Sequence, residues 1–571
     1  MIALLSLLSC TRDDGIQEPP APIIRLPRIE VQSPARGVFV DAGQQVTLAG
    51  KITPGSAPVE RLLLNGEEIE LGVDLRFSVP LEPTPGVNVV GLRVEDQGGE
   101  RAVEGLSFHY AGDNEPGEVI PDAVRMVIGP ELLDDDDPDL DDVAAIVEVL
   151  VEDPELTAGI VGTTIEESSY DIVVTGFSFD SADIDIDPQE GELPLLATLD
   201  DVVLDFDVNG KGAYSWLSTS GQGTCSEVLV YVTLEPTGGV DIEVTDADAT
   251  MHDFALEIDW VPGFIESWIE GWAQETIEEE LESTVLEMAD GVLGEYLSSF
   301  STSLPLTSSS EVTLTLSSLD VSPDGLLLTL DGLAQGWGTT LPNNAGSLRS
   351  TAAAPDWPID RSYPFAVAID DDLVDQVLFA FWATGALRIE FGAVEVAVLS
   401  GGEPLPPPLG PVAGVVLDIG LPPVIRPGDD EHGMKLQLGE FVMDIAREDG
   451  VAVTASINVV AGGDLEQQDG ALAVVLDDRP AYIDVDVGML ATPEGLDPGD
   501  LASLFRLMTP TLLGSAAGFM PTMPLPVIPV GDLFAVDELE GKGLLIQDAE
   551  VEMLESGWLT VTGEVDIVTV E

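Results

Sequence analysis

The segment from Trp260 to Phe300 constrains the fold most, because it predicts one long helix in a chain whose other segments are mostly typical of β-strands. Pro262 suits the first turn of a helix, where its missing N–H costs no hydrogen bond. Apolar residues then recur at helical spacing, with one shift in phase, while most of the glutamates fall on other faces. An apolar stripe of this kind predicts either buried core or one wall of an apolar groove.

Strand patterns surround this helix on both sides. Residues 171–187 (DIVVTGFSFDSADIDID) alternate, with Ile184 and Ile186 on one face and aspartates on the other, which predicts an antiparallel sheet with one wet face. From Pro364 the pattern starts again: PFAVAIDDDLVDQVLFAFWATGAL predicts a strand followed by a helix, and further strands follow. A second hydrophobic helix is predicted at 500–520, before closing strands at 541–568.

Charge narrows the classes of function. The formal net charge of the 571 residues is −85, from 20 Lys+Arg against 105 Asp+Glu, yet 45% of the chain is hydrophobic. That composition predicts two to four folded domains coated with acid rather than a disordered tail. Nucleic acid is excluded as a partner, since phosphates require clustered Lys and Arg, and so is tight electrostatic docking on anionic lipid. A halophilic surface and bound divalent cations both remain as explanations.

The N-terminus, MIALLSLLSCTRDDG, resembles a bacterial lipoprotein signal, although it lacks a basic segment before the apolar run. The resemblance implies that residues 1–10 are the signal, that Cys10 is acylated as a membrane anchor, and that 11–28 form a Pro-rich tether. Thr11, where the family has Asp for inner-membrane retention, implies an outer-membrane lipoprotein of the bacterial envelope. An unprocessed apolar N-terminus is the alternative. Cys225 is the only other cysteine, so no intramolecular disulfide is expected.

Residues 29–111 alternate in short segments divided by turn signals. The stretches SPARGVFVDAGQQVTLAG and LLLNGEEIEL carry a resemblance to the immunoglobulin-like β-sandwich modules of bacterial surface proteins. The resemblance implies a spacer or adhesive unit, and no binding site is predicted in it.

An acidic run follows, around which we expect a broken helix. The candidate Ca²⁺ ligands are Asp135, Asp137, Asp139 and Asp141. Because the run has neither EF-hand spacing nor the Gly and Glu that follow it in such loops, a solvated acidic loop is favoured and no metal site is predicted.

Signals for an enzyme are missing. None of the three histidines, His109, His252 and His432, stands at metal-ligand spacing from another. The sequence has no G-x-S-x-G elbow, phosphate loop or dinucleotide fingerprint. Acidic pairs carry little information in so acidic a chain. We therefore predict a protein that is not an enzyme and has no cofactor, with bound lipid and Ca²⁺ as the possible ligands.

Two halves, each with strands and a long apolar helix, resemble the tubular lipid-binding superfamily, which includes the bactericidal/permeability-increasing and lipopolysaccharide-binding proteins. The likeness rests on YDIVVTGFSFDSADIDIDPQEG, on PFAVAIDDDLVDQVLFAFWATGAL and on MPLPVIPVGDLFAVDELEGKGLLIQDAEVEMLESGWLTVTGEV. It implies an α+β fold in which the immunoglobulin-like β-sandwich precedes two tandem twisted antiparallel β-barrel/long-helix halves, at 121–345 and 346–571, in an elongated arrangement.

The resemblance also implies apolar grooves that bind or shuttle lipids, the expected partners. Candidate groove residues are Trp260, Phe264, Trp268, Trp272, Phe379, Phe381, Trp382, Leu504, Phe505, Leu512 and Phe519. The chain departs from the family in two ways: Cys225 has no disulfide partner, and the first half is acidic where relatives that bind lipopolysaccharide are basic. A structural or adhesive surface lipoprotein with solid-packed barrels is the alternative function.

Overall fold

The computed structural model describes just over two thirds of the chain. The described residues are 25–135, 140, 142–152, 161–162, 164–166, 170–212, 215–240, 242–258, 274, 278, 301–338, 346–350, 364–394, 412–429, 432–447, 452–468, 471–476, 482–489, 523–524, 542–554 and 556–569. They form two compact units. One unit consists of residues up to 36, 45–82 and 89–106, and the other of 37–44, 83–88 and 107 onwards.

Residues 28–114 form two sheets, as their alternation predicts. A three-stranded sheet has the order β1-β3-β6, with β1 at Arg28–Ser33, β3 at Thr47–Thr53 and β6 at Arg76–Pro80. The other has the order β2-β8-β7-β4-β5, formed by Phe39–Asp41, Arg101–Asn114, Gly86–Asp96, Val59–Leu64 and Glu67–Ile69. A short strand, β20 at Ser347–Arg349, pairs with β8. Leu48, Ile52, Leu62 and Leu92 are buried, so both sheets have an apolar face.

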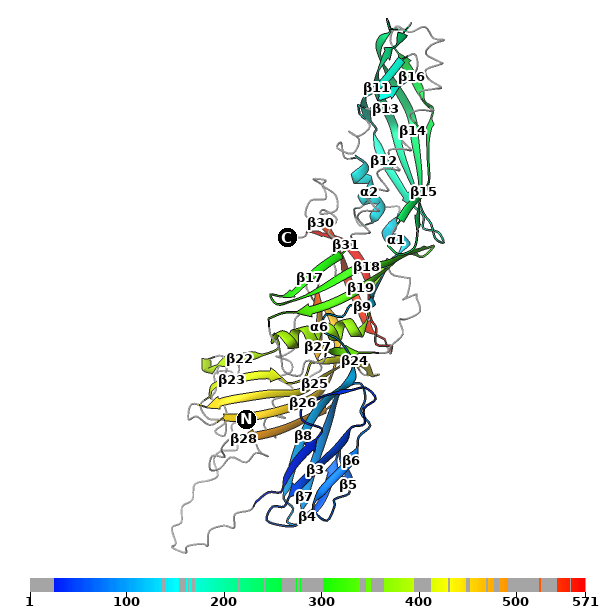
Figure 1. Ribbon diagram of the computed structural model, residues 1–571. Coiled ribbons are helices and arrows are strands. Elements are labelled where there is room, and N and C mark those ends of the chain that lie inside the picture. The colour runs from blue at the N-terminus through cyan, green and yellow to red at the C-terminus, as the bar shows by residue number, and fades with distance from the viewer. Residues whose placement is uncertain are drawn as a thin grey trace, which may run out of the picture. The chain divides into compact units, whose positions relative to one another are not determined.

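In the second unit, a seven-stranded sheet has the order β10-β11-β13-β14-β15, and β12 and β16 pair with β13 and β14 (Figure 1). Its strands are Thr164–Glu166, Tyr170–Ser178, Leu193–Gly210, Ser218–Pro236, Ile242–His252, Ser181–Ile186 and Ala255–Ile258. All the neighbouring strands are antiparallel. The predicted alternation in 171–187 is confirmed, because β12 buries Ile184 and Ile186 and exposes Asp183 and Asp185.

The central sheet joins segments from distant parts of the sequence. Its order is β17-β18-β19-β9-β21-β31-β30. The strands are Ser301–Thr307, Ser310–Ser322, Gly325–Gly336, Ile120–Ile128, Phe365–Ile369, Leu559–Thr569 and Lys542–Met553. β9 begins where we expected a broken helix. Pairing with β19 and β21 on both sides stabilises its β-branched residues as a strand instead.

An eight-stranded sheet completes this unit, with the order β22-β23-β25-β26-β27-β29 and with β24 and β28 paired to β25 and β26. The strands are Ile389–Gly392, Val412–Ile419, His432–Arg447, Ala452–Gln468, Ala471–Leu476, Met523–Pro524, Val424–Asp429 and Tyr482–Met489. Side chains from this sheet and from the central sheet share one large apolar core.

Helix α6, Asp371–Thr384, lies between these two sheets and contacts β9, β18, β19, β20 and β24. The side chain of Asp370 caps its first turn by accepting a hydrogen bond from Asp372 N–H, and Gly385 ends it in the left-handed conformation (φ 76°). The predicted strand followed by a helix is therefore confirmed in 365–384. Every residue from Asp371 to Ala383 is buried, which makes α6 a core helix rather than a surface one.

The expected α+β class is wrong. Strands make up 67% of the structure and helices 9%, and the sheets curl into half-barrels. In the described ranges the helices are three: α6, α1 at Pro130–Leu133 and α2 at Val143–Glu152. The strands are long because alternation continues without interruption, reaching 19 residues in β14. The described part of the protein is thus mostly β, and its longest helix there is α6, with 14 residues.

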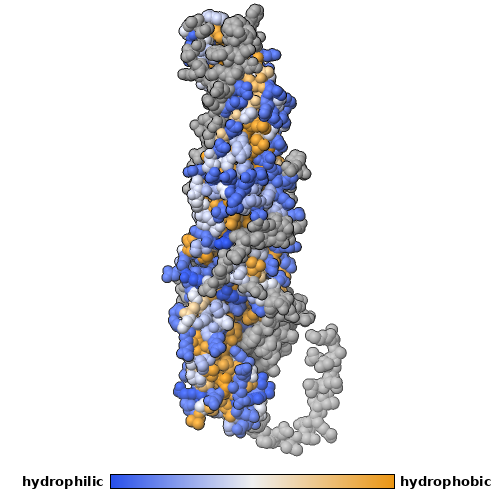
Figure 2. Space-filling model, turned by 90° about the vertical axis from the view of Figure 1, so that its right-hand side faces the viewer, coloured by the Kyte–Doolittle hydropathy of each residue, from blue (hydrophilic) through white to orange (hydrophobic). Residues whose placement is uncertain are grey.

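None of the described helices is both long and apolar enough to cross a membrane. Of the predicted helix at 260–300, only Gln274 and Glu278 are described, and both are helical. The predicted helix at 500–520 lies outside the described residues. On the face drawn in Figure 2, hydrophilic residues cover much of the surface and hydrophobic patches interrupt them.

Candidate functional site

The sheet of β10–β16 has one apolar face. Alternate residues of its strands are buried in a single cluster: Ile172, Val174, Leu204, Phe206, Val208, Val228, Val230, Val232, Met251, Leu256 and Ile258 are among its members. Residues between them in the sequence point the other way and include acidic ones, such as Asp183, Asp205 and Glu227. We call the buried side the apolar face of this sheet.

Two glycines make room on this face for aromatic rings. Gly221 pairs with Phe206, and a Cβ on Gly221 would lie 2.6 Å from the Phe206 ring. A Cβ on Gly223 would lie 2.9 Å from the ring of Phe254. The middle of β14 therefore needs glycine because aromatic side chains cross its backbone closely.

Polar groups reach this apolar face at Met251. Glu278 accepts a hydrogen bond from Met251 N–H through Oε1 at 2.9 Å, and Gln274 Nε2 donates to Met251 O at 3.2 Å. Gln274 Nε2 also lies 3.1 Å from Glu278 Oε1. Burial, with a smaller contribution from Glu278, raises the pKa of the nearby Cys225 thiol to about 11. Cys225 therefore stays protonated and unreactive at neutral pH.

Most of the predicted groove residues lie outside the described residues: Trp260, Phe264, Trp268, Trp272, Leu504, Phe505, Leu512 and Phe519. The other three are on α6. Phe381 belongs to the large core of the second unit. Trp382 packs against Phe379 and Phe39, with ring centroids 5.6 and 6.1 Å apart, and its Nε1 donates to Ile419 O at 2.6 Å. The contacts of these three residues are with the protein's own side chains.

The eight-stranded sheet carries a hollow of about 760 Å³ over β22, β23, β25 and β26. Glu390, Val416, Asp444 and Thr454 are paired across these strands and so form one row, and a second row consists of small residues, Gly392, Gly414 and Ala446. Asp444 and Ala446 are exposed, whereas their neighbour Ile445 is in the core. The hollow is therefore on the acidic outer side of the sheet and is poorly suited to an acyl chain.

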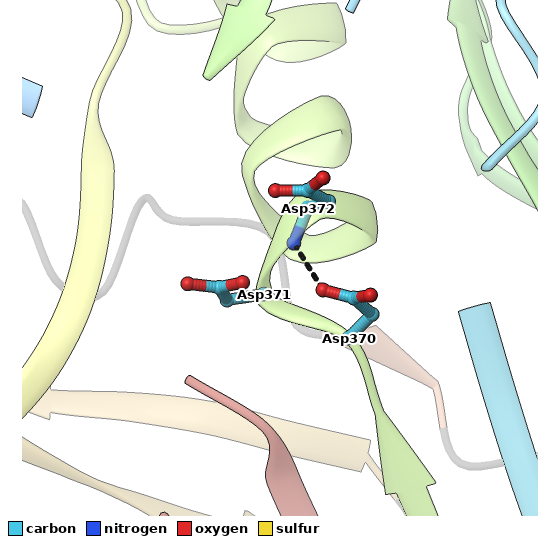
Figure 3. Close-up of side chains that lie close together, drawn as sticks. All are labelled: Asp370, Asp371 and Asp372. Carbon is cyan, nitrogen blue, oxygen red and sulfur yellow. Dashed lines mark hydrogen bonds between the residues drawn. The ribbon is translucent and has the colours of Figure 1, made fainter. Parts of the chain in front are cut away.

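Three acidic side chains lie together at the start of α6. One carboxylate oxygen from each of Asp370, Asp371 and Asp372 lies within 4.8 Å of the others (Figure 3). Two of these carboxylates have structural hydrogen bonds. Asp370 accepts from Asp372 N–H at 3.0 Å, and Asp372 accepts from the backbone N–H of Ser350. Asp371 and Asp372 are 1% and 8% exposed, so the cluster is shielded from water.

Asp375 extends this cluster by one helical turn. Its Oδ1 accepts from Ile425 N–H at 2.9 Å, and Asp371 Oδ2 lies 3.0 Å from Arg426 Nη1. Both contacts are with neighbouring residues of β24, so Asp371 and Asp375 face the same strand. The other oxygens, Asp371 Oδ1 and Asp375 Oδ2, are buried and have no hydrogen-bond partner in the described part of the chain.

Burial shifts the pKa of every carboxyl in the cluster upwards. It raises the pKa of Asp371 to about 7 against the opposing effect of Arg426, and that of Asp372 to about 6. Burial also raises the pKa of Asp370, and it places that of Asp375 well above its ordinary value. The protein therefore holds these carboxylates in a place that disfavours their charge, which is costly unless a counter-charge is present.

His109, on β8, is fully buried beside this region, with its ring 5.0 Å from that of Phe39. Burial, assisted by the positive charge of Arg426, lowers its pKa to about 4. Asp113 Oδ1 lies 3.8 Å from Nδ1, a distance usual for ion pairs, but burial raises the Asp113 pKa to about 6. With a pKa of about 4 the His109 imidazole is neutral at pH 7, so we do not interpret this contact as a salt bridge.

We expect His109→Phe to make the protein more resistant to acid. A folded pKa of about 4, below the unfolded 6.5, means that the neutral imidazole contributes stability above pH 6.5 and that this is lost as pH falls to about 4. At ~1.4 kcal/mol per pKa unit, the loss is on the order of 3 kcal/mol. Urea unfolding at pH 7 and pH 4 measures it, with the exposed His252→Phe as control. An unchanged pH dependence in His109→Phe would contradict the assignment.

The aspartate run before α2 has a structural role at its described end. Asp142 is 2% exposed and accepts hydrogen bonds from Asp135 N–H at 3.0 Å and from Ala145 N–H at 2.7 Å. The second bond caps the first turn of α2. Burial raises the pKa of Asp142 to about 6. Of the four Ca²⁺ candidates, Asp135 is described, whereas Asp137, Asp139 and Asp141 lie outside the described residues.

Sequence reasoning missed the buried acidic cluster and its partner Arg426. A signal was available in 365–384, where Asp371, Asp372, Asp375 and Gln376 interrupt an otherwise apolar segment. Polar residues spaced by three or four on an apolar helix share one face, which favours a polar contact with a neighbouring element. Nothing in the sequence indicates which element supplies that contact.

The chain matches no protein-family model, and no curated protein matches its sequence. Among solved structures, its fold is similar to that of lipopolysaccharide binding protein, with a TM-score of 0.41 and 13% identity over 80% of this chain and 100% of the other. It is also similar to P47 of Clostridium botulinum E1, with a TM-score of 0.27 and 7% identity over 79% of this chain and 100% of the other. At these TM-scores neither likeness bears on what the present protein binds.

Proposed function

We propose that this protein binds the acyl chains of lipids on the apolar faces of its curled sheets, as an acylated lipoprotein of a bacterial envelope. The observation that carries the proposal is the apolar face of β10–β16, which is formed by aliphatic and aromatic residues from six strands. The polar groups of Gln274 and Glu278 meet it at one point. This combination of a continuous apolar surface with few polar groups suits a hydrocarbon ligand.

The driving force is the burial of hydrocarbon. Each methylene that leaves water contributes ~0.8 kcal/mol, so a long acyl chain can be retained without charged contacts on the protein. That agrees with a chain of net charge −85, which repels anionic head groups. The net charge keeps the folded part of the anchored protein in water beside the membrane, so the proposal includes transfer of lipid to and from that membrane as well as storage.

The first test fills the proposed groove. Ala249 is 6% exposed on the apolar face, opposite Val230, whereas Ala255 of β16 in the same sheet is exposed. Ala249→Trp is expected to lower the lipid content of the purified protein and its uptake of a fluorescent fatty acid, because the indole occupies the space of the acyl chain. Ala255→Trp is the matched control and should leave both unchanged. Mass spectrometry of an organic extract measures the lipid.

Two results would overturn lipid binding. One is the absence of co-purifying lipid together with no uptake of the fatty acid. The other is a strong destabilisation by Ala249→Trp with no change in lipid content, since overpacking a solid core costs ~1–3 kcal/mol. Either outcome would favour the alternative, a structural or adhesive protein with solid-packed sheets.

A Cys10→Ala background extends the same experiment to the anchor, which lies outside the described residues. If Cys10 is acylated, the Cys10→Ala protein should leave the membrane fraction, and retention there would count against the lipoprotein. This background also leaves Cys225 as the single thiol. Because Cys225 lies in the apolar cluster, lipid bound on that face should slow the reaction of its thiol with a maleimide, followed at raised pH, and removal of lipid should speed the reaction.

A further inference from the structure

The charge balance at the start of α6 is unusual for a protein interior. Three carboxylates, those of Asp370, Asp371 and Asp372, gather there, and Asp375 follows one turn along the helix. In the described residues one guanidinium, that of Arg426, is paired with this group, through Asp371. With all carboxylates ionised the excess is three negative charges. Buried charges of one sign are strongly unfavourable unless they are paired or coordinate a metal.

Hydrogen bonding leaves oxygens of two carboxylates unused. Asp371 is 1% exposed, and Asp375, which is outside the group of three, is 2% exposed. Asp371 Oδ1 and Asp375 Oδ2 have no partner in the described residues, although the second oxygen of each is bound to β24. Residues four apart on a helix lie on one face, so Asp375 lies one turn along α6 on the same face as Asp371.

The backbone approaches this cluster closely from another element. Gly557, just before β31, has φ +92°, and a Cβ at this position would lie 2.7 Å from Asp371 Oδ2. Any other residue would collide with the carboxylate. The chain therefore encloses the acidic cluster between α6, β24 and residue 557.

We propose that Asp370, Asp371, Asp372 and Asp375 bind a divalent cation, Ca²⁺. Carboxylate oxygens are the ligands of hard cations, and Ca²⁺ accepts several of them in irregular geometry, whereas Mg²⁺ demands an octahedron and retains water. One Ca²⁺ reduces the excess of three negative charges to one. It also supplies a partner for Asp371 Oδ1 and Asp375 Oδ2. The site is independent of lipid binding and would fix the start of α6 against β24.

The test titrates the full chain with Ca²⁺ after treatment with EDTA, in buffered salt that screens the acidic surface. We expect one site to saturate before the weak surface sites and the thermal unfolding midpoint to rise with it. Asp371→Asn/Asp375→Asn should weaken this site by on the order of tenfold or more, since affinity depends on the number of charged ligands. Asp418→Asn/Asp444→Asn is the control, because both aspartates are exposed on the eight-stranded sheet, and it should titrate like the unsubstituted chain.

Unequal folding of the variants is controlled in two ways. Asp371→Asn leaves Arg426 buried without its carboxylate and should lower the unfolding midpoint in EDTA. Asp375→Asn, which keeps the Asp371–Arg426 pair, is therefore titrated beside the double variant and should also weaken the site. Tb³⁺ gives a readout on the unsubstituted chain, because Trp558 follows Gly557 directly and can sensitise an ion bound at Asp371. Trp558→Phe should remove that emission while Ca²⁺ still binds.

Three results would overturn the proposal. They are a Ca²⁺ titration without a distinct first site, a double variant that binds Ca²⁺ as tightly as the unsubstituted chain, and Tb³⁺ emission that Trp558→Phe leaves intact. Mg²⁺ displacing Ca²⁺ at equal concentration would overturn the choice of ion. A Ca²⁺ titration without a distinct first site would mean that protons rather than cations neutralise the cluster. It would not affect the proposal of lipid binding.

Discussion

Replacing Trp382 with alanine is expected to lower the free energy of unfolding by about 3–5 kcal/mol, the usual cost of deleting a large buried aromatic side chain. Trp382 is 5% exposed and packs on Phe39 and Phe379. The truncation also leaves Ile419 O without the indole donor at 2.6 Å. Urea unfolding followed by circular dichroism measures the change.

Trp382→Phe separates packing from hydrogen bonding. It retains most of the ring contacts and loses the Nε1–H, so a cost of about 1–2 kcal/mol is expected. The same pair of variants tests our sequence-based prediction that Trp382 lines a lipid groove. If Trp382→Ala removed bound lipid while stability stayed nearly constant, Trp382 would be a ligand contact and the core assignment would be wrong.

Arg426→Met is expected to lower the free energy of unfolding by about as much as Trp382→Ala does, because it leaves the Asp371 carboxylate buried without its guanidinium partner. Breaking a buried pair by removing one partner costs about 3–5 kcal/mol. The pair is shielded, with side chains 17% and 1% exposed. Because Arg426 lowers the Asp371 pKa, Arg426→Met should raise that pKa above its present value of about 7. Unfolding is therefore measured in EDTA over a range of pH, and the loss relative to the unsubstituted chain should grow as pH rises.

The double variant Arg426→Met/Asp371→Asn provides the control. Since it removes both charges, it should recover most of the stability lost in Arg426→Met. A double variant as unstable as the single one would mean that Arg426 acts through the packing of its aliphatic stem rather than through Asp371.

Local signals in the sequence predicted individual elements well. The alternation in 171–187 predicted β11 and β12 with the correct buried face. The strand pattern FAVAI, followed by aspartates and an apolar run, predicted β21 and α6. Each of these depends on neighbours in the chain, which is why periodicity and capping suffice.

Elements that depend on distant partners could not be predicted. Residues 123–128 satisfy a helix as well as a strand, and only pairing with β19 and β21 decides for the strand. The three aspartates at 370–372 look like a solvated cap, since nothing nearby indicates that Ser350, Arg426 and Gly557 will enclose them. Burial of charge is a tertiary property, and the candidate site was missed for that reason.

The expected α+β class was wrong because it was judged from the most conspicuous helical segment of the sequence. One helical pattern at 260–300 suggested that each half is organised around a helix, whereas the described chain devotes 67% of its structure to strands. α6 is 14 residues long, and its role is to connect the two neighbouring sheets of its unit.

The central sheet has a consequence for how the protein is made. β9, at Ile120–Ile128, pairs with β21, and β21 in turn needs β31, at Leu559–Thr569. A ribosome therefore releases the first of these strands long before the last, and β21 keeps one hydrogen-bonding edge open until residues 559–569 emerge. Folding dominated by such long-range pairing is slow and exposes aggregation-prone edges. The growing chain is therefore expected to expose this edge of β21 until synthesis is nearly complete.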